Sequence, residues 1–112
     1  MVNNFNGESG RVFISGKMRG LDERDWRKKF NDAERDLVLA GWHPNNIVNP
    51  AKLSLIYPEL SRFAYMQIDL KLLEDCGTIY LLTNWKESQG AKMEWDKAQQ
   101  LNLTVIFEGE TE

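Results

Sequence analysis

Two acidic residues stand on the apolar faces of segments that the sequence predicts to be helical. In the last such segment, Ala91, Trp95 and Ala98 recur at i, i+4 and i+7 and should face a core. Glu94 lies on or beside this stripe, and Asp69 falls within the apolar arc of the preceding helical segment. A buried carboxylate is costly unless it is hydrogen-bonded or used, so both residues are candidates for catalysis.

Paired carboxylates in different environments are the means by which enzymes split glycosidic bonds. One carboxylate can be the nucleophile, while the other positions it or handles a proton. A non-catalytic role remains open for each residue. Glu94 could escape to water or pair with Lys92 or Lys97, and Asp69 could be a structural group bonded to backbone amides.

A loop with two glycines and two cations follows the first apolar run of the chain. Its basic side chains could cradle a phosphate or a sugar, although basic residues are common in loops of any kind. The residues of this loop that we expect to contact a substrate are Ser15, Gly16, Lys17 and Arg19.

A second loop with suitable chemistry precedes the last helical segment. Exposed amides and the Ser88 hydroxyl at a helix N-terminus would form an anion site, and Gly90 would let a ligand approach the backbone. The simpler interpretation of Ser88 is a helix N-cap. Trp85 lies between polar neighbours, so we expect it to stay outside the core and stack on a base. His43 could contact a base or lie at the surface, and we expect the surface position.

The elements that must position these residues alternate between strands and helices. We expect strands at 12–15, 47–48, 78–82 and 103–107, and helices at 23–40, 58–75 and 89–101, with a loop from Ala51 to Tyr57. This order predicts an α/β protein: a single-domain flavodoxin/Rossmann-like three-layer sandwich with a four- to five-stranded parallel sheet. The domain should span residues 11–108 and follow a flexible tail at 1–10. The ligand cleft of such a sheet lies at the carboxyl ends of its strands.

Composition excludes several classes of function. A net charge of −3 argues against a nucleic-acid partner, because such surfaces need clustered Lys and Arg. With one His and one Cys, a Cys/His zinc site is excluded, and no other metal or cofactor is indicated. No apolar run approaches the roughly 20 residues of a membrane span. The single Cys76 fits a reducing compartment, so we expect a cytoplasmic protein that binds no membrane.

Three blocks together resemble the nucleoside 2-deoxyribosyltransferase superfamily. They are Phe13 to Gly20, Asp69-Leu70 and Ser88 to Glu94, in this order along residues 11 to 107. The nearest patterns are those of the deoxyribosyltransferases and the 2′-deoxynucleoside 5′-phosphate N-hydrolases. The chain is most similar to short bacterial and phage members with a Trp-x-x-Ser-x-Gly-Ala-x-x-Glu signature, which Trp85 to Glu94 matches.

The resemblance implies a role for each block. Glu94 would correspond to the nucleophile that attacks the anomeric carbon of the sugar, and Asp69 to the acidic partner that holds and tunes it. The Gly16 loop would meet the sugar or its 5′ group, and Ser88 with Arg19 would meet a 5′-phosphate. The ligand would be a small nucleoside or nucleotide, and the protein a homodimer or a higher homo-oligomer.

The chain also departs from the pattern. Phe13 aligns with a tyrosine of the N-hydrolases, Gly77 replaces an aspartate, and the chain ends soon after Phe107. Three hypotheses follow: an N-glycosidic enzyme, a non-catalytic nucleotide-binding or regulatory module, and a structural protein in which Glu94 and Asp69 only form buried hydrogen bonds.

Overall fold

Four parallel strands form the centre of the computed structural model, which describes residues 10–109. Their order across the sheet is β2-β1-β3-β4, so β1 and β3 are the inner strands. The strands are β1 (Val12–Ser15), β2 (Ile47–Val48), β3 (Thr78–Leu81) and β4 (Thr104–Phe107). This is the strand order of a flavodoxin-like sheet, in which the direction of chain progression reverses between β1 and β3.

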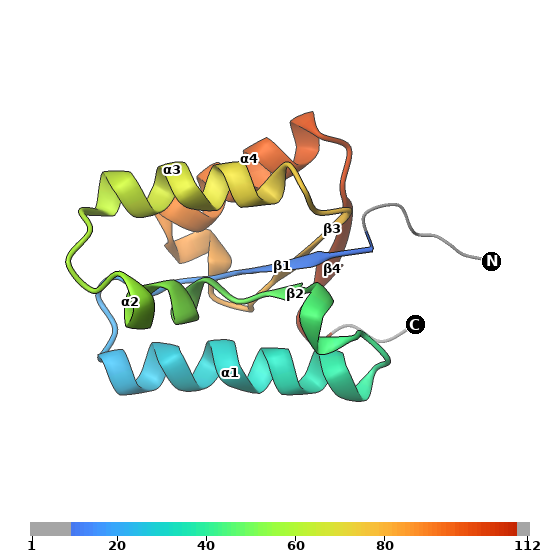
Figure 1. Ribbon diagram of the computed structural model, residues 1–112, viewed down its shortest axis with the longest axis horizontal. Helices are drawn as coiled ribbons and strands as arrows, with labels where there is room; N and C mark the ends of the chain where they lie inside the picture. Colours follow the sequence, from blue (N-terminus) through green and yellow to red (C-terminus); the bar gives the residue numbers. More distant parts are fainter. Residues whose placement is uncertain (1–9, 110–112) are drawn as a thin grey trace.

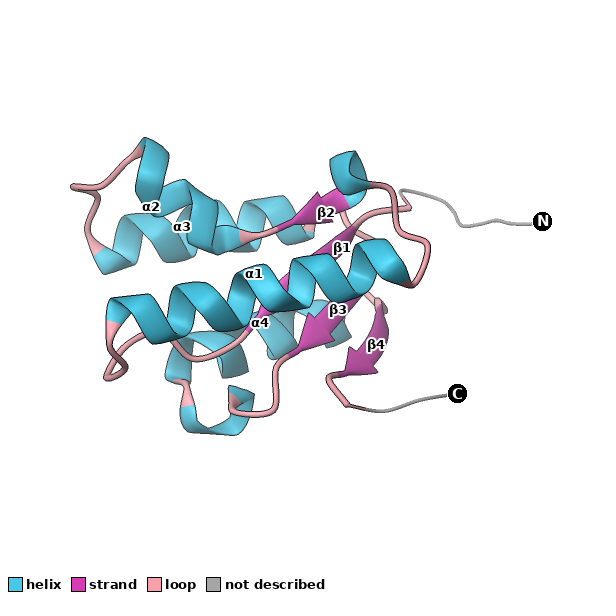
Figure 2. Cartoon of the chain, turned by 90° about the horizontal axis from the view of Figure 1, so that it is seen from below, coloured by secondary structure: helices cyan, strands magenta, loops and turns pink. Residues whose placement is uncertain are grey.

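Helices cover both faces of the sheet and complete the three layers (Figure 1). α1 lies on one face, and α3 and α4 lie side by side on the other. The helices are α1 (Glu23–Leu39), α2 (Leu53–Ile56), α3 (Arg62–Leu73) and α4 (Gln89–Gln100). The described residues also contain the 3₁₀ turns η1 (Pro44–Asn46), η2 (Pro50–Lys52) and η3 (Trp85–Glu87). Figure 2 shows the sheet from the side that α1 covers.

The alternation of side chains along β1 divides the core into two halves. Val12 and Ile14 pack with Phe30, Ala33 and Leu37 of α1. Phe13 points the other way, into the half of the core that α3 and α4 cover. Because successive side chains in a strand alternate, Ser15 faces the same side as Phe13. The sheet therefore aims a hydroxyl at the layer that carries Glu94 and Asp69.

The expected architecture is confirmed: one α/β domain with a parallel sheet, here of four strands within residues 10–109. α1 begins after Asp22, whose carboxylate accepts from the Arg24 amide at 2.9 Å, as its N-cap position predicts. The expected flexible tail lies almost entirely outside the described residues. Within them, no helix combines the length and the apolar character that crossing a bilayer would require.

The segment between β2 and α3 differs from the prediction. The expected loop from Ala51 to Tyr57 contains α2, and the helix expected to begin at Pro58 begins only at Arg62. The reason is local capping: the Ser61 hydroxyl accepts from the Ala64 amide at 3.1 Å and so starts α3. Pro58 lies in the turn between the two helices instead.

Candidate active site

Glu94 is buried within α4. It lies on the same helix face as the buried Ala91 and Ala98, and only 5% of its surface is exposed. The apolar periodicity of the helix thus places this carboxylate against the sheet, as the sequence predicts. Two non-catalytic alternatives for Glu94 are wrong. Its side chain does not reach solvent, and it does not pair with a lysine of its own helix, since Lys92 is exposed and Lys97 bonds to Glu74.

Ser15 is the residue of the sheet that meets Glu94. Its hydroxyl donates to Glu94 Oε1 at 2.6 Å, and Ser15 itself is 1% exposed. Ser15 ends β1, in register with Leu81 of β3, and therefore lies where the strand order reverses. The hydrogen bond connects residues 79 positions apart in the chain.

Asp69 approaches Glu94 from the neighbouring helix. It is 8% exposed on α3, which packs against α4, and its carboxyl group lies close enough to that of Glu94 for each to shift the pKa of the other. Its Oδ1 atom is buried and has no hydrogen-bond partner among the described residues. The two acidic side chains thus meet at the sheet, and one oxygen of the pair is left to bond something else.

Burial dominates the electrostatics of this pair. It raises the pKa of Asp69 from 3.8 to about 6, and the hydrogen bond to Glu94 only partly opposes the rise. The pKa of Glu94 is raised well above its ordinary value, first by burial and then by the charge of Asp69. The hydrogen bond from Ser15 acts in the opposite direction on the pKa of Glu94. The pair therefore holds a proton at pH values where two separate carboxyls would have lost theirs.

The loop after β1 is packed against the loop after β3. A Cβ atom added to Gly16 would lie 2.5 Å from Leu82 Cδ1, so only glycine fits beside this side chain. The Lys17 amide donates to Asn84 Oδ1 at 3.0 Å, and Lys17 Nζ lies 3.5 Å from Glu87 Oε1. Sequence reasoning missed Asn84, for which the position after a buried strand is the only signal. Arg19, expected beside these residues, is exposed.

The start of α4 has a structural role in this structure. Ser88 is its N-cap, and the Ser88 hydroxyl accepts from the Ala91 amide at 3.0 Å. Gly90 gives room to α3, because an added Cβ would lie 3.0 Å from Met66 Cε. Neither observation assigns a ligand contact to Ser88 or Gly90, so their expected part in binding stays a prediction.

Trp85 corrects one expectation. Its polar neighbours predict a place outside the core, but it is 9% exposed and belongs to the half of the core under α3 and α4. Its ring centroid lies 5.2 Å from that of Trp95 and 6.4 Å from that of Phe107. The turn η3 directs the ring inward although its sequence neighbours are polar. Base stacking on Trp85 is therefore not supported.

The comparison with protein families identifies one match. The family described as Domain of unknown function (DUF4406) matches residues 10–107, which is nearly the whole described domain. The chain belongs to the DUF4406 family. No curated protein and no solved structure shows significant similarity to it.

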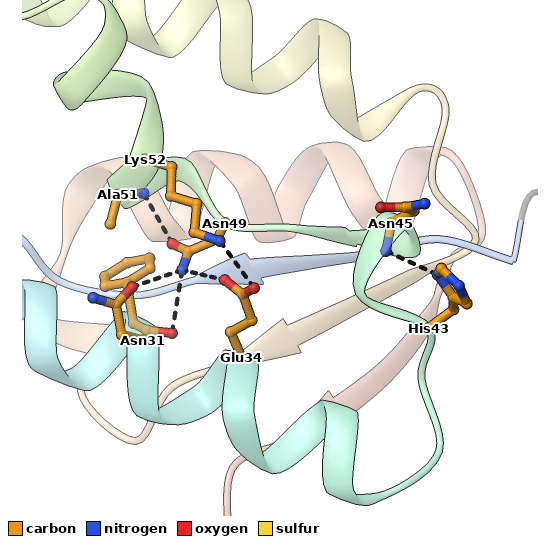
Figure 3. A network of polar contacts seen from close by, with 8 residues as sticks. Asn31, Glu34, His43, Asn45, Asn49, Ala51 and Lys52 are labelled. Atoms are coloured by element: carbon orange, nitrogen blue, oxygen red, sulfur yellow. Dashed lines mark hydrogen bonds and ion pairs between the residues drawn. The ribbon is translucent and has the colours of Figure 1, made fainter.

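The DUF4406 domain carries a second polar network, on the side of the sheet that faces α1 (Figure 3). The buried Asn49 amide donates to Asn31 Oδ1 at 3.1 Å and to Glu34 Oε1 at 2.9 Å, while its oxygen accepts from the Ala51 amide. Lys52 adds an ion pair to Glu34 at 3.0 Å. This network fastens the end of β2 to α1. His43, as expected, is exposed, and its Nδ1 accepts from the Asn45 amide.

Proposed function

We propose that this protein cleaves or transfers at the N-glycosidic bond of a (deoxy)nucleoside or a nucleoside 5′-monophosphate, with Glu94 as nucleophile. The observation that carries the proposal is the meeting of two buried carboxyls, Glu94 and Asp69, from helices that pack against each other. The pair lies beside Ser15, at the strand end where α/β sheets of this order bind ligands. The resemblance to the deoxyribosyltransferase superfamily supports the same assignment.

The chemistry follows from one ionised carboxylate. A Glu94 oxygen bonds to the anomeric carbon while the carbon–nitrogen bond breaks. The electron pair of the broken bond leaves with the base, which takes up a proton from solvent. Water or a second base then attacks the same carbon and releases Glu94. Inverting glycosidases instead hold their carboxyls about 6.5–9.5 Å apart around a water. Retaining glycosidases hold theirs about 5–5.5 Å apart, with the second carboxyl as nucleophile. Glu94 and Asp69 interact too closely to hold a water between them, so the proposal takes the covalent route and gives Asp69 the role of positioning the nucleophile.

The proposed ligand is a small nucleoside or nucleotide. Lys17 and Arg19, which follow Ser15 in the loop after β1, are the basic residues proposed to bind a 5′-phosphate. The assignment of Ser88 to the same phosphate belongs to this proposal. So do the cytoplasmic location and a homodimer or higher homo-oligomer, which the resemblance suggests.

One observation favours a second candidate, a nucleotide-binding module without catalysis. Glu94 and Asp69 are 5% and 8% exposed, and the Ser15 hydroxyl already occupies one oxygen of Glu94. A carboxylate so enclosed can serve the fold or a ligand without reacting. Such a module would be stabilised by a nucleotide and would leave the nucleotide intact.

The deciding experiment follows deoxynucleosides and their 5′-monophosphates by ligand-observed NMR for several hours. We expect the parent to release free base and Glu94→Gln to lose roughly a thousandfold or more of that rate while staying folded. Glu59→Gln, which changes an exposed glutamate in the same way, is the matched control and should keep the parent rate. Absence of base release from every substrate would refute the proposal, and stabilisation without release would select the binding module.

A further inference from the structure

The position of Ser15 differs from that expected of a residue that contacts a ligand. It is the last residue of β1, it is 1% exposed, and its carbonyl accepts from the Leu82 amide at 2.8 Å. Backbone pairing to β3 therefore fixes its Cα on an inner strand. Its one hydroxyl proton is committed to Glu94 Oε1 at 2.6 Å, a short distance typical of a donor bonded to a carboxylate.

We infer that Ser15 is the positioning residue of Glu94: its hydroxyl holds the Glu94 carboxyl in one orientation and favours the ionised form of that carboxyl. This inference deepens the proposed function, on which its catalytic consequence rests, and it replaces the expectation that Ser15 contacts substrate. A hydroxyl that donates to a carboxylate gains more than one that donates to a neutral acid. Removing the hydroxyl should therefore favour the protonated carboxyl.

Few other groups near Glu94 could favour the ionised form of its carboxyl. Asp69 of α3 acts against ionisation, because it is a second acid in contact with Glu94. On η3, the Lys86 ammonium lies over the Trp85 ring, and Glu87 pairs with Lys17.

The remaining ionisable neighbours are directed elsewhere. Tyr80 of β3 belongs to the opposite half of the core. On α4 itself, Lys92 and Asp96 are exposed, and Lys97 bonds to Glu74. Among the described residues, Ser15 is thus the group whose contact favours the Glu94 anion.

A test that needs no activity is a carbon-13 NMR titration of the glutamate carboxyls, with the Glu94 signal assigned by its loss in Glu94→Gln. We expect Ser15→Ala to move the Glu94 titration to higher pH. Ser15→Thr retains the hydroxyl and should restore the parent curve. Ser15→Cys, with a similar size and a weak donor, should fall between them, and it carries the test if Ser15→Ala does not fold. If the Glu94 titration curve of Ser15→Ala, or of Ser15→Cys where Ser15→Ala does not fold, coincides with that of the parent, the inference is overturned.

The matched activity measurement is the pH profile of base release. The acidic limb of kcat should move to higher pH in Ser15→Ala, with a loss of roughly tenfold to a hundredfold below the limb and an unchanged KM. Ser61→Ala removes a hydroxyl that caps α3, so it should leave the pH profile in place. A KM effect without a change in the profile would instead make Ser15 a substrate contact and overturn the inference. If the parent releases no base, the proposed function fails, and the NMR titration still decides the role of Ser15.

Discussion

Replacing Asp69 by asparagine should stabilise the protein at neutral pH. The asparagine side chain has nearly the same shape, and its amide could donate to the Glu94 carboxylate. Burial raises the pKa of Asp69 from 3.8 to about 6, which means that folding favours its protonated form. Because one pKa unit corresponds to about 1.4 kcal/mol, the ionised Asp69 lowers the free energy of unfolding by about 3 kcal/mol at neutral pH.

The sign of the pH dependence follows from the raised pKa. Below about pH 3, Asp69 is mostly protonated in both the folded and the unfolded chain, and its ionisation costs the folded state almost nothing. As the pH rises from about 4 through about 6, the unfolded chain ionises first, and the parent loses stability over this window. Glu94, whose pKa is also raised, acts in the same direction. Asp69→Asn lacks the Asp69 contribution entirely.

Urea unfolding at several pH values between 3 and 8 measures this difference. The free energy of unfolding of Asp69→Asn minus that of the parent should grow by about 3 kcal/mol between pH 3 and pH 7. Asp96→Asn, which changes an exposed aspartate of α4, should give a difference that does not depend on pH. Carboxylates other than Glu94 are common to all chains and cancel. Removing the Asp69 charge also lowers the pKa of Glu94, which changes the difference in the same direction. Parallel pH curves for parent and Asp69→Asn would show that Asp69 is not held in a buried pair.

Two further predictions concern packing. Gly16→Ala should lower the free energy of unfolding by about 1–3 kcal/mol, because its Cβ would lie 2.5–2.9 Å from three atoms of Leu82. Gly90→Ala should lower it less. Equal urea midpoints for the two variants would contradict this packing. Asn49→Ala should cost about 1–3 kcal/mol, because it leaves a buried backbone amide and two α1 side chains without their partner, and Asn45→Ala at an exposed position should be near neutral by the same measurement.

The secondary structure could be predicted wherever local pattern and capping agree. The apolar period of α4 and its Ser88 cap indicate the correct helix, and the same period predicts that Glu94 faces the core. The predicted start of α3 is wrong because two signals compete. Pro58 suits a first helical turn, but the Ser61 cap further along the chain begins the helix.

The contacts of the site depend on the fold and have no local signal. Ser15 is followed by the loop that carries Gly16, Lys17 and Arg19, so its sequence context suggests a ligand contact. Only the packing of α4 on β1 brings it to Glu94, 79 positions away. Trp85 is the opposite case, since Asn84 and Lys86 suggest exposure while η3 turns its ring into the core. Strand alternation gives the face of the sheet on which Ser15 lies but not its partner. No periodicity applies to Trp85, which lies in a short 3₁₀ turn.

The burial of Glu94 and Asp69 is what the structural hypothesis predicts, but the energetics of the pair favour the proposed catalytic role. Two apolar side chains of similar volume would fill the space between α3, α4 and β1 without any desolvation cost, and such replacements are often neutral or stabilising. Here both carboxyls are disfavoured as anions by burial, and Asp69 Oδ1 is buried without a partner among the described residues. Within the same part of the chain, only Ser15 donates a hydrogen bond that favours the Glu94 anion. An arrangement that weakens the fold at neutral pH, yet holds one carboxylate oriented at the end of β1, supports the proposed role of Glu94 as nucleophile.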